Sequence, residues 1–260
     1  MKLVNKMFAV FLGVATLAVS VNAQAATCAS HLRFVHGHAF KDEAISVVVN
    51  GVQTDALQFR EIGKYLSVES GKKHVQFFST ITGELIGEKT FVAGSGMAYT
   101  ILVAGPAKGP EGTLYGNSSP FILVDDITPP NTGRWKGHWY RMSETNVVID
   151  FRISSASDYN NEIYRLYAKP NRASYQLPDH VAGTYNFNPV LPGSSEPFFN
   201  EALNPPRKVE LGNISIGGGQ VIDVFALGNF LGKGPNSLDL TYQIYTPVIS
   251  TESGCIGIQY

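Results

Sequence analysis

One short segment concentrates charged and aromatic side chains. It spans residues 134–141 and reads Arg-Trp-Lys-Gly-His-Trp-Tyr-Arg. Alternate residues of a strand point to opposite faces, so Arg134, Lys136 and His138 would share one face and the two tryptophans the other. Cations beside aromatic rings suit sulfated or phosphorylated groups and the faces of sugars. The candidate ligand-binding residues are Arg134, Trp135, Lys136, His138, Trp139, Tyr140 and Arg141. The alternative is a sandwich strand whose tryptophans enter the core and whose charges stay in water.

The histidines near the start of the chain are a weaker candidate site. His36 and His38 would share one face of a strand, and with a carboxylate such as Asp42 or Glu43 they could bind a divalent transition metal. The spacing fixes no third ligand. We therefore favour a hydrogen-bonded, structural His36 and a solvated His38, and we expect no metal and no cofactor.

Motifs of common catalytic sites are missing from the sequence. It has neither a Gly-x-Ser-x-Gly elbow nor a His-Glu-x-x-His pair. The glycines at 217–219 precede a strand-like run, whereas a phosphate-binding loop would lead into a helix. Residues 158–162 resemble the start of a calcium loop, but Ile163 and Lys169 stand where that loop needs glycine and glutamate. These observations favour a binding protein over an enzyme.

The elements that carry these residues are predicted to be strands. Runs of Val, Ile, Phe, Tyr and Thr are separated by turn formers, such as Asn50-Gly51 and the glycines of 94–96. Apolar and polar residues alternate in several runs, as at 238–244, which is typical of a sheet with one dry face. The sequence therefore predicts an all-β protein built from packed sheets.

The chain also repeats itself. Residues 91–105 and 214–228 both look like two strands joined by a glycine hairpin turn. Two further pairs of segments correspond in the same order: 32–38 with 137–141, and 45–51 with 147–153. A spacing of about a hundred residues lets each unit bury its own core. We predict two tandem immunoglobulin-like antiparallel β-sandwich domains.

Composition shifts divide the chain further. Lys2 and Lys6, an apolar run and Ala-Gln-Ala at 23–25 predict a signal peptide over 1–25. The Pro-rich stretch 128–133 predicts a linker between domain 1, at 26–127, and domain 2, at 134–260. Seven prolines between 168 and 207 predict a long loop in domain 2, laid over one sheet or over the domain contact.

Charge and cysteines restrict the partners. Of 20 basic residues, two lie in the signal peptide, which leaves 18 against 21 acidic ones. Such a chain has no global attraction for nucleic acid, and we expect no transmembrane segment after cleavage. The only cysteines are Cys28 and Cys255. An exported protein meets an oxidising compartment, so we predict that they form a disulfide that brings the two ends of the chain together.

The order of these segments resembles a known family. The stretch from Leu32 to His36, the strand ending in Asn50-Gly51, the run Val75-Gln-Phe-Phe and the glycine-hinged segment 91–105 are similar to the domain-of-unknown-function 4397 family. This resemblance covers 31–127 closely and 134–246 more loosely. The family usually has an aspartate and prolines after the motif histidine, and this chain does not. The resemblance implies bacterial exported β-sandwich domains, often in tandem, and it implies no activity.

The first functional hypothesis is a secreted, non-enzymatic binding protein, located in the periplasm or outside the cell. Its target would be a cell-surface, matrix or host component, such as an anionic glycan, a lipid headgroup, a phosphorylated group or a protein, and a role in virulence would fit. One alternative is an extracytoplasmic hydrolase whose site assembles only in three dimensions. Another is a structural component of the envelope or matrix.

Overall fold

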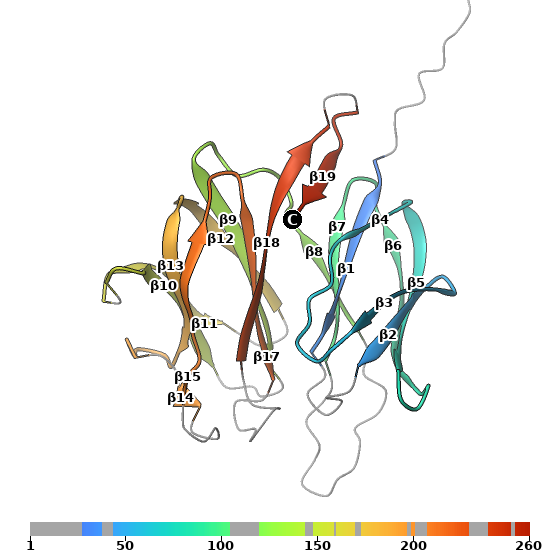
Figure 1. Ribbon diagram of the computed structural model, residues 1–260, viewed down its shortest axis with the longest axis horizontal. Helices are drawn as coiled ribbons and strands as arrows, with labels where there is room; N and C mark the ends of the chain where they lie inside the picture. The colour runs from blue at the N-terminus through green and yellow to red at the C-terminus, as the bar shows by residue number, and fades with distance from the viewer. Residues whose placement is uncertain are drawn as a thin grey trace, which may run out of the picture.

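The computed structural model describes residues 28–37, 44–104, 120–143, 148–158, 160–169, 173–196, 199–200, 207–228, 239–250 and 253–260. The predicted signal peptide and the candidate residues His38, Asp42 and Glu43 lie outside these ranges. Every regular element within them is a strand (Figure 1), which confirms the all-β prediction. The described residues include no helix long and apolar enough to cross a membrane.

Domain 1 contains eight strands in two sheets. Sheet A has the order β4-β1-β7-β8, and sheet B has the order β3-β2-β5-β6. The strands are β1 (Ser30–His36), β2 (Ile45–Val49), β3 (Val52–Leu57), β4 (Leu66–Val68), β5 (Gly71–Ser79), β6 (Leu85–Ala93), β7 (Ala98–Val103) and β8 (Phe121–Asp125). In β2 the burial alternates residue by residue, because one face of the sheet is in the core. Phe34, Phe77 and Ile101 pack between the two sheets.

Domain 2 is built in the same way, with additions. Sheet C has the order β12-β9-β17-β18-β19, and sheet D has the order β11-β10-β13-β16. The strands are β9 (Arg134–Ser143), β10 (Ile149–Ser155), β11 (Glu162–Lys169), β12 (Ala173–Val181), β13 (Gly183–Val190), β16 (Leu211–Ile216), β17 (Val221–Gly228), β18 (Asp239–Ile249) and β19 (Ile256–Gln259). The short strands β14 (Phe199–Asn200) and β15 (Arg207–Lys208) pair with each other. Trp135, Trp139 and Phe151 lie in the hydrophobic core of this domain.

The two domains share one strand order, which confirms the repeat. Taken along the chain, β1 to β8 correspond to β9 to β13 and β16 to β18, and each pair of equivalents occupies the same place in its sheet. The two glycine turns do not form the predicted hairpins, however. They carry the chain from β6 in sheet B to β7 in sheet A, and from β16 in sheet D to β17 in sheet C. Because the chain changes sheet there, β7 pairs parallel to β1 and β17 parallel to β9.

Positive φ angles explain the glycines of these turns. Gly96 has φ 71° and Gly219 has φ 85°, a region that side-chain-bearing residues rarely adopt. The amide of Met97 donates to the carbonyl of Gly94, and the amide of Gln220 donates to that of Gly217. The two turns are therefore equivalent, and they provide a common origin for counting residues in β7 and β17.

The prediction of a long loop at 168–207 is wrong for residues 173–190, which form β12 and β13. Pro178 falls where the pairing of β12 with β9 shifts register, between Leu177 and His180. Pro189 lies beyond Phe187, the last residue of β13 that pairs with β16. Proline lacks an amide hydrogen, and at a bulge or an unpaired edge no ladder bond is lost.

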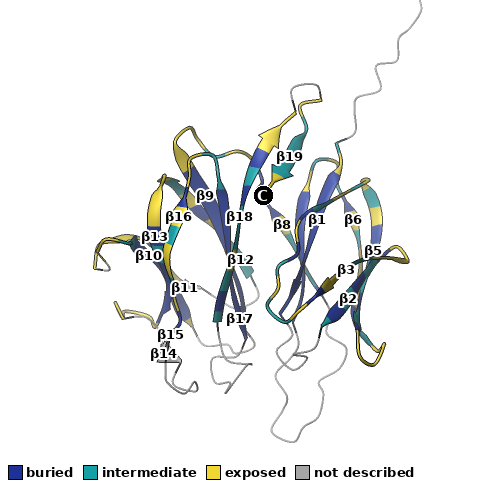
Figure 2. Cartoon of the chain, viewed as in Figure 1, coloured by how far each residue is buried: buried dark blue, intermediate teal, exposed yellow. Residues whose placement is uncertain are grey.

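Sheets A and C lie face to face, so the molecule has four layers in the order B, A, C, D (Figure 1). Strand β8 ends at Asp125 and β9 begins at Arg134, and the predicted linker lies between them. Cys28 and Cys255 form the predicted disulfide, with their Cα atoms 5.5 Å apart. Figure 2 shows burial along β1 and β17 and along β9 after Arg134. Both faces of these central strands of the inner sheets are thus covered.

Candidate functional site

Strand β9 carries the seven candidate ligand-binding residues, and it is an inner strand of the four-layer stack. Trp135 and Trp139 lie in the core of domain 2, where Trp139 stacks on Phe151 with 4.6 Å between ring centroids. Their neighbours Lys136, His138 and Tyr140 point the other way, as the alternation predicts, but they face domain 1 and are buried. Arg141 is buried as well, and Arg134 alone of the seven is exposed. An exposed cationic strip is therefore not formed.

What the structure assembles instead is a polar network between sheets A and C, with Arg33 of β1 at its centre. The Arg33 side chain is fully buried, and its Nη2 lies 2.6 Å from Oδ2 of Asp223 on β17. It also donates from Nε and Nη2 to the hydroxyl of Thr100, at 3.0 and 2.7 Å. A third donation, from Nη1 at 3.1 Å, reaches the side-chain oxygen of Gln243 on β18. One guanidinium thus links both domains.

Asp125, the last residue of β8, is the second anion of this network. Its carboxylate accepts hydrogen bonds from the hydroxyls of Tyr65 at 2.8 Å and Thr100 at 2.7 Å, and from the hydroxyl of Tyr140. Arg33 Nη2 lies 3.8 Å away. Burial raises the pKa of Tyr65 and of Tyr140 far above the usual value, so both remain hydroxyl donors. Three hydroxyl donors, two from domain 1 and one from domain 2, thus hold the Asp125 carboxylate between the sheets.

His138 of β9 supplies the second cation. Its Nδ1 lies 2.7 Å from Oδ1 of Asp223, with both side chains almost completely buried. Burial alone would lower the pKa of His138, but the adjacent Asp223 carboxylate prevails and raises it. Conversely, burial would raise the pKa of Asp223, and Arg33 and His138 together lower it. With His138 protonated, two cations balance two carboxylates.

Apolar clusters close the network at both ends. At one end Val35, Leu102, Tyr140, Phe225 and Leu227 pack together. At the other end the cluster joins Tyr65, Ala98, Ile127, Val221 and Tyr245 to the half-buried side chains Ile256 and Ile258 of β19. Each cluster takes residues from both domains. The charges are therefore enclosed by apolar surface contributed by sheets A and C together.

Ion pairs at the rim complete the contact. Lys136 Nζ lies 2.7 Å from Oδ2 of Asp126, which directly follows β8. Burial opposes ionisation of Asp126, but hydrogen bonds from Lys136 and Thr128 lower its pKa to about 2. Elsewhere on the rim, Arg60 lies 3.4 Å from Asp239, and both side chains are partly exposed. These ion pairs therefore attach the segment after β8 to domain 2 and the start of β18 to domain 1.

Sequence reasoning missed the centre of this site. Arg33 and Asp223 are charges inside apolar strand segments, Leu-Arg-Phe-Val and Val-Ile-Asp-Val. Such a charge is buried only with a partner, and this was the available signal. His36, the weak metal candidate, is buried and packs its ring 5.7 Å from that of Phe59. The described residues hold no group of three or more His, Cys, Asp or Glu that could bind a metal ion.

The comparison with protein families bears on domain 1. The model of the family described as "Domain of unknown function (DUF4397)" matches residues 30–136. These residues form a DUF4397 domain. The match begins with β1, includes all eight strands of domain 1 and ends within β9, so it confirms the predicted resemblance for domain 1. The second sandwich has the strand order of the DUF4397 domain. None of the curated proteins matches the chain.

The geometry suits a structural role for the network better than turnover. The charged side chains of Arg33, His138 and Asp223 are enclosed, so a substrate could reach them only if the domains separated. Buried ion pairs whose members are all paired favour one arrangement of the groups that carry them, because any other arrangement leaves a charge unpaired in a dry environment. The site therefore holds the DUF4397 domain and the second sandwich in one relative orientation.

Proposed function

We propose that this protein is an exported, non-enzymatic binding protein, in which two sandwiches act as one rigid body and the outer face of sheet B contacts the target. The disulfide and the resemblance to exported domains support export, to the periplasm or beyond the cell. The observation that carries the proposal is that, among the described residues, the outward side chains of the central strands β2 and β5 of sheet B stay partly or fully exposed, whereas those of β1, β7, β10 and β17 in the other sheets are almost all buried.

The outer faces of the four sheets differ in exposure among the described residues. Those of sheets A and C bury each other at Arg33 and Asp223. That of sheet D is buried at Asp150, Arg152 and Asn188, and the carbonyl of Ser195 accepts a 2.8 Å hydrogen bond from Arg152. Segment 191–196 thus contacts the outer face of sheet D at Arg152 and Arg165. The outward residues of β2, β5 and β6 in sheet B remain partly or fully exposed.

Polar side chains on this face contact one another in the unbound protein. His74 Nε2 lies 3.0 Å from Oε2 of Glu88, and Gln76 donates to the same oxygen at 3.2 Å. Phe78 is half-buried nearby on β5, and Val92 on β6 is 73% exposed. Polar groups already held in place beside apolar surface lose little conformational entropy on binding. This composition suits a neutral glycan or a protein surface better than the anionic groups expected of the octet 134–141.

The test is binding by the oxidised full chain without its signal peptide. The probes are an array of neutral, sialylated and sulfated glycans, and phosphatidylcholine vesicles with and without phosphatidylserine. We expect saturable binding to an array glycan and a loss of about tenfold or more for Val92→Lys or Gln76→Lys. Val181→Lys is the matched control, because Val181 is a 61% exposed valine on β12, away from sheet B.

Three results would contradict the proposal. The first is equal loss for Val181→Lys and Val92→Lys, which would remove sheet B as the contact surface. The second is binding only to the phosphatidylserine vesicles, which would identify an anionic target. The third is release of a cleaved product from a bound glycan, which would identify a hydrolase.

A further inference from the structure

Strand β19 has no equivalent among the described strands of domain 1, and it contacts both domains. It pairs with the end of β18 over Thr246–Ile249. The carbonyl of its first residue, Ile256, accepts a 2.8 Å hydrogen bond from Nε2 of His31 on β1. The backbone amide of Tyr65 in domain 1 donates to the hydroxyl of Tyr260, the residue after β19. Sheet C therefore ends in a strand that reaches across the domain contact (Figure 1).

This strand shields one end of the buried ion network. Ile256 and Ile258 pack against Tyr65 and Tyr245, and the Tyr260 ring lies 6.3 Å from that of Tyr245. Tyr65 and Tyr245 in turn flank the Arg33 guanidinium, with ring centroids 4.4 and 5.9 Å from its Cζ. A single layer of tyrosines thus separates β19 from Arg33. Removing β19 would open that layer to water.

The strand is held to domain 1 by a covalent bond at its base. Cys255 immediately precedes β19, and it is bonded to Cys28. Cys28 is fixed to domain 1, because its carbonyl accepts hydrogen bonds from the hydroxyl of Ser95 at 2.9 Å and the amide of Gly96 at 3.2 Å. The bridge thus joins an anchored residue of domain 1 to the residue that precedes the four-residue strand β19.

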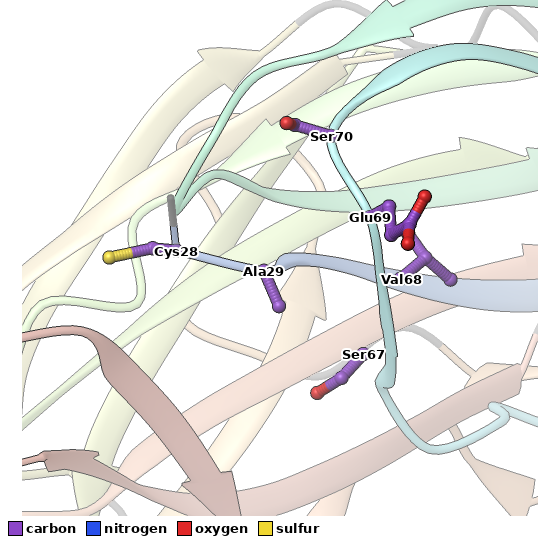
Figure 3. A pocket seen from close by; sticks show the side chains of 6 residues that line it. All are labelled: Cys28, Ala29, Ser67, Val68, Glu69 and Ser70. Atoms are coloured by element: carbon purple, nitrogen blue, oxygen red, sulfur yellow. The ribbon is translucent and has the colours of Figure 1, made fainter. Parts of the chain in front are cut away.

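The bridge is not enclosed in a core, because both cysteines are only half-buried. A hollow of about 430 Å³ adjoins Cys28, and its walls are Cys28, Ala29, Ser67, Val68, Glu69 and Ser70. Figure 3 shows the chain from Ser67 to Ser70 running beside Cys28 and Ala29. Structural disulfides in cores are protected by burial, whereas both cysteines of this one are partly exposed.

We propose that the Cys28–Cys255 disulfide is a releasable latch, whose opening by a dithiol reductant frees β19 and admits water to the Arg33 network. One thiolate of the reductant attacks a bridge sulfur, which forms a mixed disulfide and expels the other cysteine as a thiolate. The second thiol of the reductant then displaces the protein sulfur. The protein ends with two thiols, and the reductant ends as its own disulfide. This inference does not depend on the target proposed above.

The test is hydrogen–deuterium exchange of the folded, oxidised protein before and after reduction with dithiothreitol. We expect exchange to accelerate about tenfold or more at Ile256–Gln259, at Thr246–Ile249 and at the amide of Tyr65, because these bonds depend on the latch. Amides that pair β5 with β6 in sheet B serve as the internal control and should not change. The double variant Cys28→Ser/Cys255→Ser controls for the reagent, and dithiothreitol should not alter its exchange.

Two outcomes would overturn the latch. Undiminished protection of β19 and Tyr65 after complete reduction, verified by alkylation and mass measurement, would show that the bridge does not hold the strand. Equal acceleration in sheet B would show that reduction merely destabilises the whole protein. Because reduction is applied to folded protein, the test remains decisive if the double variant does not accumulate.

Discussion

The two sheets that meet at the domain contact have the same strand order but different residues at equivalent positions. Counted from the glycine turns, Thr100 of β7 is equivalent to Asp223 of β17. Their parallel partners are Arg33 and His138, which are therefore equivalent as well. A neutral hydroxyl in domain 1 thus corresponds to a carboxylate in domain 2. That carboxylate pairs with both cations, Arg33 from the other domain and His138 from its own.

The edges of the two sheets differ in a similar way. Asp125 pairs with Ala98, and Tyr245 pairs with Val221, which is the equivalent of Ala98. An anion in domain 1 thus corresponds to an aromatic ring in domain 2, and the ring flanks Arg33. Equivalent faces meet in this contact, since Ala98 and Val221 lie in one apolar cluster. The difference between the domains, rather than their likeness, supplies the charge complementarity that holds them together.

The largest expected effect comes from a position where the two domains carry side chains of different size. Leu32 of β1 is equivalent to Gly137 of β9, and a Cβ at Gly137 would lie 2.1 Å from the carbonyl oxygen of Ile222. Gly137→Ala must therefore push β9 away from β17. We expect a loss of about 4 kcal/mol or more in unfolding free energy, or no folded protein. Urea unfolding and soluble yield measure this effect.

The comparison for this prediction is Leu32→Ala. Here a core side chain becomes smaller, with an expected cost of about 2–5 kcal/mol from the lost burial and the cavity. This variant should fold with sheet A intact. A Gly137→Ala protein that unfolds at the urea concentration of the unmodified chain would show that β9 and β17 can separate freely, and the close approach would then have no structural importance.

The second effect tests the charge difference directly. Asp223→Asn keeps the shape of the side chain but leaves Arg33 and His138 without their shared anion. Breaking a buried ion pair in this way costs about 3–5 kcal/mol. The equivalent change in domain 1, Thr100→Ala, removes a hydroxyl and should cost about 1–3 kcal/mol. Denaturant unfolding of both variants, with the disulfide intact, gives the two values, and equal losses would contradict the asymmetry.

The side of a strand on which a residue's side chain lies could be predicted from the sequence. The alternation of β9 placed the tryptophans opposite Lys136 and His138, and this placement agrees with the structure. The internal repeat likewise predicted the two sandwiches, because glycine turns with positive φ mark equivalent points of the chain.

What covers the second face could not be predicted, because a strand with one face in a core looks the same whether its other face meets water or another domain. Lys136 and His138 are typical of a solvated face, yet here they meet domain 1. The prolines of 168–207 misled for a related reason. A proline excludes a strand only where its missing amide would have been paired, and pairing depends on neighbours distant in sequence.

The third prediction concerns the pH dependence of the contact. The pKa of His138 in the folded protein lies above its usual value, so its contribution to stability is complete below the unfolded pKa of about 6.5. That contribution is lost as the pH rises through the folded pKa, by at most about 1.4 kcal/mol per pH unit. His138→Gln should remove this alkaline decline in urea-unfolding free energy.

His180, on β12 and outside the network, provides a control of opposite sign. Burial and the nearby Arg134 lower its pKa, so its contribution to stability is complete above the unfolded pKa of about 6.5 and is lost as the pH falls through the lower folded pKa. His180→Gln should therefore flatten the acid side of the stability curve and leave the alkaline side unchanged. An alkaline decline that persists in His138→Gln would mean that another group controls the contact.

The smallest expected effect tests whether the charge complementarity between the domains stabilises their contact because the charges are buried. Asp239 lies 3.4 Å from Arg60 and also joins the two domains, but both side chains are partly exposed. Water already solvates such a pair, so Asp239→Asn should cost less than about 1 kcal/mol, and the cost should disappear in about 1 M salt, where charges are screened within about 3 Å. The cost of Asp223→Asn should persist in the same salt, because counterions do not enter the closed network. If both costs fell together, the central charges would be accessible to solvent, and the domains would be in exchange with a separated state.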